Sequence, residues 1–366
     1  MTGEGRMLVG PAPHIHVRQS SASLAWGTAL VLSPAFLWGL YCFGFDALIP
    51  VAVAIVAAMA GEALVGLLLG NMTLHDGTAF LTGFLIGLSM PPGIPFYVPA
   101  IASLFAVCIV KGAFGGLGSN WMNPALAGLV FALLNWPAEM GTWTWPRHMA
   151  GLAGISGATP LGFVHSRILS GTQSGDALGL LGAAGYSVSG FDSGVTGFLN
   201  SGLFGRFGVS LPTGYIDLLV GNKAGSIGEL SGILLLAGSI VLISRRMIRW
   251  EIPASLLVVF GGLAWTFGGL PFGNGFFSGD LLFELCSGSL LLVAFFMATD
   301  PVTSPSTRGG MLLYGACIGA LTFVLRQFGS SAEGVAFAVV IMNCFVPSIS
   351  RVELRRRTHS QRSDRG

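Results

Sequence analysis

Long apolar segments, each nearly free of charged residues, dominate this sequence and restrict the folds open to it. Of the 366 residues, 52% are hydrophobic and 9% are charged, and the mean hydropathy is +0.75. Charged residues make up about 25% of a soluble domain, and a helix needs about 20 apolar residues to cross a bilayer. The sequence therefore predicts an all-α polytopic membrane protein with about ten transmembrane helices. The expected spans are 24–44, 47–70, 78–90, 94–113, 121–136, 226–244, 252–270, 281–298, 310–327 and 333–349.

Basic residues predict how these spans are oriented. If the N-terminus lies in the cytoplasm, 13 of the 18 Lys and Arg residues fall on the cytoplasmic side, as the positive-inside rule favours. An even number of spans returns the C-terminus to that side and exports the long loop 137–225. The first 22 residues contain no apolar core of a cleavable signal, so we expect the first span to be retained. A net charge of +2 gives no indication of nucleic acid as a partner.

The sequence also shows a weak internal duplication. Lys-Gly-Ala-Phe-Gly at 111–115 is echoed by Arg-Gln-Phe-Gly at 326–329, and Gly-x-x-Phe-Ala occurs at 128–132 and again at 334–338. Five spans followed by five begin on opposite sides of the membrane, so such a repeat must be inverted. Coincidence in a sequence rich in Gly and Phe is the alternative. The predicted segments are a cytoplasmic N-terminal segment 1–23, a first five-helix half 24–136, the exported loop 137–225, a second five-helix half 226–349 and a basic cytoplasmic tail 350–366.

Two Pro-rich interruptions indicate broken backbone at the ends of spans. The third span stops at Met-Pro-Pro-Gly-Ile-Pro, residues 90–95, and the eighth ends in Asp-Pro-Val-Thr-Ser-Pro, residues 300–305. Pro removes backbone donors, and broken backbone at membrane depth persists only against protein or a wet cavity. Both interruptions are therefore candidate sites. Much of the glycine, 55 residues in all, is expected to serve close packing between helices.

A small polar hexapeptide, Ser-Gly-Ala-Thr-Pro-Leu at 156–161, stands in the exported loop. Gly157 and Ala158 leave the backbone unobstructed, Thr159 offers a hydroxyl, and Pro160 fixes the chain directly after it. This composition suits the attachment of a bulky group to the threonine oxygen. An ordinary Ser/Gly/Thr turn is the alternative.

Several further motifs follow one another in an order that resembles one family of membrane proteins. They are Pro-His-Ile-His at 13–16, Met-Pro-Pro-Gly at 90–93, Phe-Gly-Gly-Leu-Gly-x-Asn-x-x-Asn-Pro-Ala at 114–125, Gly-Ser-Ile-Gly-Glu at 225–229 and Met-Ala-Thr-Asp-Pro-Val at 297–302. Together with the hexapeptide they resemble the flavin-carrying family that comprises the D subunit of Rnf electron-transport complexes and the B subunit of the sodium-pumping NADH:quinone reductase. Thr-Pro-Leu at 159–161 and Thr-Ser-Pro at 303–305 are more similar to the Rnf branch of the family.

This resemblance implies that FMN is esterified through its phosphate to Thr159, within a recognition sequence of Ser156, Gly157 and Ala158. A separate flavin transferase would make the bond. The resemblance also implies a second, non-covalent flavin, which is riboflavin in the quinone-reductase relative, near Asn120 and Asn123. The chain departs from the family pattern at two positions, Ala153 in place of Asp and Leu230 in place of a small hydroxylated residue.

The polar groups near these motifs allow two interpretations each. Gly225 and Ser226 open the sixth span, where free amides and the positive helix end suit an anionic group; a helix N-cap by Ser226 is the alternative. The amides of Asn120 and Asn123 can hydrogen-bond a flavin without adding charge, whereas helix capping by Asn120 is the structural alternative.

Carboxylates within or beside the spans are candidates for ion coupling, because charges at membrane depth are costly and tend to be functional or paired. We expect Glu229, one turn inside the sixth span, to be the leading candidate, followed by Glu284 and Asp300. Glu62 and Glu284 could instead pair with another subunit. Lys111 is expected to snorkel to the inner interface. The five cysteines stand singly, without metal-site spacing, and are expected to be packing residues, with no metal site.

The resulting hypothesis is a membrane flavoprotein subunit of an Rnf-type ferredoxin:NAD oxidoreductase, which relays electrons and couples them to Na⁺ or H⁺ movement. We find no dinucleotide fingerprint after a strand, so no NAD site of its own is expected, and it should not be catalytic alone. Its partners would be the other membrane and peripheral subunits, among them a second FMN-carrying subunit, and the lipid of the bacterial cytoplasmic membrane. The alternatives are an inverted-repeat transporter or channel without redox chemistry, and the B subunit of the quinone reductase.

Overall fold

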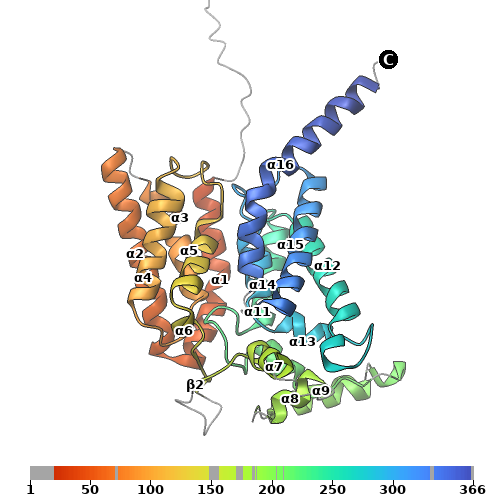
Figure 1. The fold of residues 1–366 in the computed structure, drawn as a ribbon. Helices are drawn as coiled ribbons and strands as arrows, with labels where there is room; N and C mark the ends of the chain where they lie inside the picture. Colours follow the sequence, from red (N-terminus) through yellow and green to blue (C-terminus); the bar gives the residue numbers. More distant parts are fainter. Residues whose placement is uncertain are drawn as a thin grey trace, which may run out of the picture.

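The computed structural model describes residues 20–70, 73–147, 156–169, 176–183, 186, 188–202, 204–208, 210–329 and 334–363. Two groups of helices stand side by side, and a smaller third group lies across one end of them, away from the C-terminus (Figure 1). The first group comprises α1 (Ser21–Phe43), α2 (Phe45–Leu69), the 3₁₀ turn η1 (Leu74–Asp76), α3 (Thr78–Leu88), α4 (Tyr97–Leu104), the π-helix η2 (Phe105–Gly112) and α5 (Pro124–Asn135).

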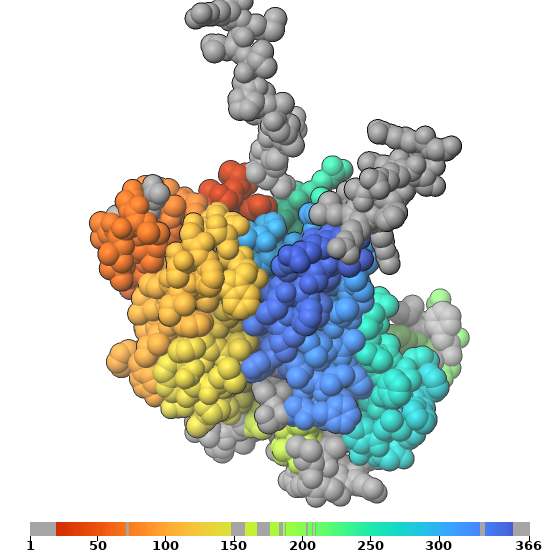
Figure 2. Space-filling model, turned by 45° about the horizontal axis from the view of Figure 1, so that its top comes forward, coloured from red at the N-terminus to blue at the C-terminus, as the bar shows by residue number. Residues whose placement is uncertain are grey.

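The second group contains the helices of the C-terminal half. They are α11 (Gly232–Ser244), α12 (Glu251–Phe267), η4 (Leu270–Phe272), α13 (Leu281–Cys286), α14 (Leu290–Leu292), the π-helix η5 (Val293–Met297), α15 (Arg308–Phe328) and α16 (Gly334–Ser363). The two groups meet where α1 packs on α11 and α5 packs on α16. Figure 2 shows the second of these contacts at the surface, with the yellow residues of α5 beside the dark blue residues of α16.

Glycines allow the closest helix contacts within each group. In α3, a Cβ at Gly83 would lie 2.6 Å from the Ala54 carbonyl oxygen of α2. In α15, a Cβ at Gly319 would lie 2.5 Å from the Leu256 carbonyl oxygen of α12. Small residues let helix backbones approach in this way in membrane proteins. The predicted use of glycine for helix packing is confirmed at these positions.

Five helices in the described residues are long and apolar enough to cross a membrane. They are Ser21–Phe43, Phe45–Leu69, Glu251–Phe272, Arg308–Phe328 and Gly334–Glu353. Four shorter apolar helices, Thr78–Leu88, Tyr97–Gly112, Pro124–Asn135 and Gly232–Ser244, occupy further predicted spans. A helical, multi-pass membrane protein is therefore confirmed. The count of ten spans and their inverted repeat stay predictions.

Two predicted spans differ from the structure because non-helical backbone enters them. The predicted span 226–244 is helical only from Gly232, and the predicted span 281–298 breaks between α13 and α14, where Gly288 has a φ of +69°. The segment before α11 reaches the interruption after α3: the Ile227 amide donates to the Met90 carbonyl at 3.2 Å, and the Gly228 amide donates to the Leu88 carbonyl at 2.7 Å. The non-helical segments of the two halves thus hydrogen-bond to each other in the interior, because buried backbone groups need partners there.

The third group is formed by the long loop of the sequence prediction. Its elements are α6 (Pro137–Met140), β1 (Trp143–Thr144), β2 (Ser156–Gly157), α7 (Pro160–Leu169), α8 (Ala177–Ala183), α9 (Gly190–Gly202), η3 (Phe204–Phe207) and α10 (Tyr215–Val220). The two short strands pair antiparallel, with Trp143 opposite Gly157 and Thr144 opposite Ser156. A separate apolar cluster, which includes Leu161, Leu181 and Leu218, holds α7, α8 and α10 against α13.

Candidate functional site

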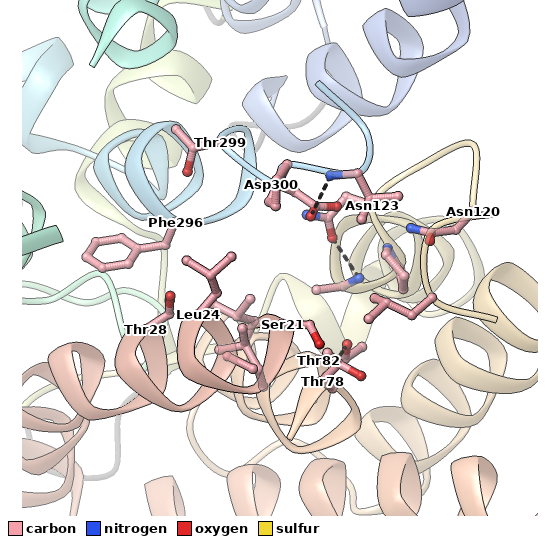
Figure 3. Close-up of a pocket in the computed structure, with 18 of the residues that line it drawn as sticks. Ser21, Leu24, Thr28, Thr78, Thr82, Asn120, Asn123, Phe296, Thr299 and Asp300 are labelled. Atoms are coloured by element: carbon pink, nitrogen blue, oxygen red, sulfur yellow. Dashed lines mark hydrogen bonds between the residues drawn. The ribbon is translucent and has the colours of Figure 1, made fainter. Parts of the chain in front are cut away.

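A cavity with a mainly apolar lining and several polar side chains lies between the two helix groups, at the end of the molecule where α1 begins (Figure 3). It offers about 160 Å³ to water-sized groups, whereas one water needs about 10–15 Å³ on this measure. The cavity is therefore large enough for part of an organic molecule. Its polar lining residues are Ser21, Thr28, Thr78, Thr82, Lys111, Asn120, Asn123, Thr299 and Asp300.

Asn123 holds the start of α5 and ties the two groups together. Its Oδ1 accepts the amides of Ala125 at 2.9 Å and Leu126 at 3.3 Å, and its Nδ2 donates to the Met297 carbonyl at 2.9 Å. Asn123, followed by Pro124, is therefore the helix cap. The predicted capping by Asn120 is wrong, because the helix starts at 124 and not at 121.

Asn120 and Asp300 shape the two loops that face each other across the cavity mouth (Figure 3). Asn120 accepts the Gly118 amide at 3.3 Å and donates to the Met122 carbonyl at 3.2 Å. Asp300 accepts the Val302 amide at 3.3 Å and the Thr303 hydroxyl at 3.1 Å. The structure thus brings three predicted site residues, Asn120, Asn123 and Asp300, to one cavity. The Pro-rich interruption 300–305 contributes to its lining together with the Gly-rich segment before Asn120, whereas the interruption 90–95 does not line it.

Lys111 does not snorkel to an interface, so that prediction is wrong. Its side chain is buried, and its Nζ donates to both carboxylate oxygens of Glu62 at 2.9 Å and to the Thr78 hydroxyl at 2.7 Å. An ammonium has three donors, and all three are used here. Glu62 also accepts the Thr73 hydroxyl. The ion pair joins α2 to η2, so Glu62 is paired within the chain and the predicted alternative of a partner in another subunit is not needed.

Thr159 lies at the opposite end of the molecule, directly before α7 (Figure 1). Its Oγ1 accepts the Gly162 amide at 3.1 Å, and its carbonyl accepts the Phe163 amide at 2.8 Å, so it caps the helix. The residue is 5% exposed. The hexapeptide is therefore a short strand, Ser156–Gly157, followed by a helix cap, and not a simple turn.

Ala158, the residue before the threonine, is held by a residue that lies far away in the sequence. The Tyr186 hydroxyl donates to the Ala158 carbonyl at 3.1 Å. Burial raises the pKa of the Tyr186 phenol above its ordinary value, so the hydroxyl keeps the proton that it donates. Sequence reasoning missed this contact, because 28 residues separate the two partners and no motif marks Tyr186.

Ser226 and Glu229 lie in the non-helical segment before α11. The helix cap is Ser231, which accepts the Leu234 amide, so the predicted capping by Ser226 and the placement of Glu229 inside a helix are wrong. The amides of this segment are not free either, because the Ser226 amide donates to Glu229 Oε1 at 3.0 Å. Within the described residues, the buried Ser226 Oγ and Glu229 Oε2 have no hydrogen-bond partner.

Glu284 is paired within the chain. Arg326 Nη1 donates to its carboxylate at 3.1 Å and to its carbonyl at 2.8 Å, while Nη2 donates to the Ser287 carbonyl at 3.1 Å. The carbonyls are available because α13 ends at Cys286. A buried charge pair needs such additional hydrogen bonds to offset its desolvation. Arg326 therefore neutralises Glu284 and binds the carbonyl groups left free where the helix breaks. The sequence did not predict this role.

The arrangement defines a class: a helical multi-pass membrane protein in which two helix groups enclose a cavity with polar groups in its lining and interrupted helices meet inside. The model of the NQR2, RnfD, RnfE family matches residues 8–359, and the chain belongs to this family. The predicted family is therefore confirmed.

Three relatives, each the D subunit of an oxidoreductase complex, show how far the similarity extends. The D subunit of the proton-translocating ferredoxin:NAD(+) oxidoreductase complex of Clostridium ljungdahlii is 35% identical over 94% of this chain and 93% of the relative. The D subunit of the ion-translocating oxidoreductase complex of Stutzerimonas stutzeri is 38% identical over 92% of this chain and 91% of the relative. The D subunit of the Na(+)-translocating ferredoxin:NAD(+) oxidoreductase complex of Acetobacterium woodii is 31% identical over 95% and 94%.

Proposed function

We propose that this chain is the D subunit of an ion-translocating ferredoxin:NAD(+) oxidoreductase complex. This proposal rests on similarity along more than nine-tenths of the chain to three relatives that are named as D subunits of oxidoreductase complexes. Its partners are then the other subunits of the complex, including a second FMN-carrying subunit, and membrane lipid. The membrane is the bacterial cytoplasmic membrane, with both termini in the cytoplasm and α7–α10 outside.

FMN esterified to Thr159 by a flavin transferase is the proposed covalent cofactor, and the residues present fit it. Thr159 Oγ1 stands at the N-terminal end of α7, where the amides of the first turn and the helix dipole favour an added phosphate charge. Gly157 and Ala158 add little bulk beside the oxygen, and Pro160 fixes the first helical residue. The flavin supplies the electron transfer when bound, and the protein supplies its position and surroundings.

The cavity between the helix groups is the proposed place of a second flavin, riboflavin or another. Both Asn120 and Asn123 bond to backbone through the oxygen and the nitrogen of the side-chain amide. The bonds of Asn120 are longer, 3.2 and 3.3 Å, than the 2.9 Å bonds of Asn123 to the Met297 carbonyl and from the Ala125 amide. Asn120 is therefore the better candidate of the two to exchange a bond with a ligand, and the Thr82 hydroxyl, which donates to the Thr78 carbonyl, can still accept one.

Glu229 is the proposed ion-coupling carboxylate. Its buried Oε2 has no hydrogen-bond partner in the described part of the chain, and its charge is attracted by the buried Lys223, whereas Glu284 is bonded directly by Arg326. A buried acceptor without a partner is costly unless a proton, water or cation reaches it. Asp300 is the second candidate because it lines the cavity. The relatives include both a proton-translocating and a Na(+)-translocating complex, so either ion is compatible with the proposal.

Deleting the gene for this chain tests the proposed function. Inverted membrane vesicles from the deletion strain should lose NAD⁺ reduction by reduced ferredoxin together with the ion uptake that accompanies it, and the intact gene should restore both. Undiminished ferredoxin-dependent NAD⁺ reduction in the deletion strain would reject the assignment. The restored strain gives a second test. If its chain carries no flavin and its vesicles still show undiminished NAD⁺ reduction and ion uptake, a transporter without redox chemistry is favoured.

A further inference from the structure

The helix α9 has its polar residues inside and its apolar residues outside. Asp192 and Thr196 are 0% and 1% exposed, whereas Phe191 and Phe198 are 62% and 75% exposed. A helix on the surface of a globular domain has the opposite arrangement, with its apolar stripe toward the core. Single exposed apolar residues are ordinary in proteins, but a helix that reverses the whole pattern indicates an apolar environment on its outer side.

Hydrogen bonds hold the polar face of α9 against the rest of the third group. Asp192 accepts the amides of Gly214 and Asp217, both at 2.9 Å. Asn200 accepts the Leu211 amide at 2.8 Å and donates to the Leu211 carbonyl at 2.9 Å. These bonds fix the rotation of α9 about its own axis, so the fold itself turns the phenylalanines outward.

The outward side of α9 has two different faces. Because about 3.6 residues make one helical turn, the positions of Phe191, Val195 and Phe198 share one face, and those of Ser193 and Ser201 share the next. Both serines are exposed, and neither face carries a charged residue. The helix therefore offers apolar side chains on one part of its exposed surface and small hydroxyls on another.

The position of α9 brings its apolar face to the level of the membrane surface. Figure 1 shows α9 crosswise to the long helices, at the end of the second group. Leu211, to which α9 is bonded, packs on the same apolar cluster as Phe272, the last residue of the span Glu251–Phe272. The chain after this span presents two further exposed rings, Phe276 and Phe277. Aromatic residues are enriched where spanning helices leave the bilayer, so α9 is tethered at that level.

We propose that α9 is an interfacial helix that lies along the membrane surface, with Phe191 and Phe198 in the lipid headgroup region and with Ser193 and Ser201 in water. Helices of this kind lie in the membrane plane and bury one apolar face at the boundary of headgroups and acyl chains. The exposed Arg206 in η3, shortly after α9, suits the phosphate of a headgroup. This inference does not depend on the attachment of a flavin.

Spin labels on the full-length chain test this arrangement. The five native cysteines are replaced, and one cysteine at a time is introduced by Phe191→Cys, Phe198→Cys, Ser193→Cys or Ser201→Cys. Each labelled chain is reconstituted into vesicles of phosphatidylethanolamine and phosphatidylglycerol. Electron paramagnetic resonance then measures collisions of the label with oxygen, which concentrates in lipid, and with a water-soluble nickel chelate. The serine variants are matched controls, because they place the same label at exposed positions of the same helix.

The ratio of oxygen to nickel collisions should be about three- to tenfold higher for labels at 191 and 198 than for labels at 193 and 201, since only the first pair enters the bilayer boundary. Equal ratios at the four positions would overturn the inference. Equal ratios in vesicles of the chain alone, with immobilised labels at 191 and 198 in the whole complex, would also overturn it and would assign the apolar face to a protein partner.

The unsubstituted chain gives a second test that does not depend on the folding of any variant. It is reconstituted with a phospholipid that carries a photoactivatable group near its headgroup, and the peptides are analysed by mass spectrometry after illumination. Lipid adducts should occur on Phe191 and Phe198 and not on Ser193 or Ser201. Adducts on the span Glu251–Phe272 without any on α9 would overturn the inference.

Discussion

The hydroxyl of Thr159 caps α7, and a phosphoester at the same oxygen would leave its charge at the same helix end. Thr159→Ala should abolish the in-gel fluorescence of the denatured chain, because no acceptor oxygen remains. Membrane insertion should persist, since the lost cap costs only about 1 kcal/mol in a peripheral helix. Ser156→Ala, which leaves the acceptor in place, should retain most of the fluorescence. A fluorescent Thr159→Ala band would move the attachment to another residue.

Glu229 gives the sharpest prediction about coupling. Glu229→Gln keeps the shape and the acceptor oxygen that binds the Ser226 amide but removes the charge. The complex with this change should keep its covalent flavin and lose most of its ion-coupled electron transfer, measured as ion uptake in inverted vesicles. Glu139→Gln is the matched control, because that carboxylate accepts the Tyr97 hydroxyl at an exposed position. Normal ion uptake by Glu229→Gln would leave Glu229 a structural residue.

Among the helices, the pairing of α12 with α15 depends on the absence of a side chain. Gly319→Ala would place a methyl group 2.5 Å from the Leu256 carbonyl oxygen, so the backbones must separate at a cost of about 1–3 kcal/mol. Gly262→Ala in α12 is the control, because a Cβ there meets nothing within 4 Å. The thermal unfolding temperature in detergent should fall for Gly319→Ala and stay level or rise for Gly262→Ala. Equal temperatures would contradict the packing described here.

The buried pair of Lys111 and Glu62 connects α2 to η2 and yields a test with an internal control. Lys111→Met leaves a carboxylate buried without its cation, which costs about 3–5 kcal/mol. Adding Glu62→Gln removes that charge, so the double variant should be more stable than Lys111→Met alone. Thermal unfolding in detergent measures both. A double variant less stable than Lys111→Met would show that the pair is not the source of the effect.

The sequence predicted helices better than it predicted what lies between them. Apolar length is a local property, and helices occupy the predicted ranges. The segment before α11 was missed because the amides of Ile227 and Gly228 bond to the carbonyls of Met90 and Leu88. This long-range contact holds an apolar, helix-like sequence in a turn instead of a helix. The partners of Lys111 and Arg326 were missed for the same reason. The cavity of Asn120, Asn123 and Asp300 was predicted in part, because a Gly-rich motif precedes Asn120 and a Pro-rich interruption begins at Asp300. The other Pro-rich interruption, 90–95, does not line the cavity.

At the scale of the whole molecule, the proposed topology requires that α7–α10 lie on the outer side of the membrane. Figure 1 shows this group at the end away from the C-terminus. The test uses a chain whose five native cysteines are replaced. In that background, the Ser201→Cys variant in α9 should react with an impermeant thiol reagent in spheroplasts, and the Ser360→Cys variant should react only after the membrane is opened. The reverse pattern would place Thr159 on the cytoplasmic face.

Covalent FMN at Thr159 can be tested directly on the native protein by mass spectrometry. The complex is isolated from the membranes of its own organism, the chain is digested with a protease, and the peptide that contains residues 156–161 is analysed. We expect a peptide that is heavier by the mass of FMN less one water, with fragment ions that place the addition on Thr159. An unmodified peptide recovered in full yield would contradict it.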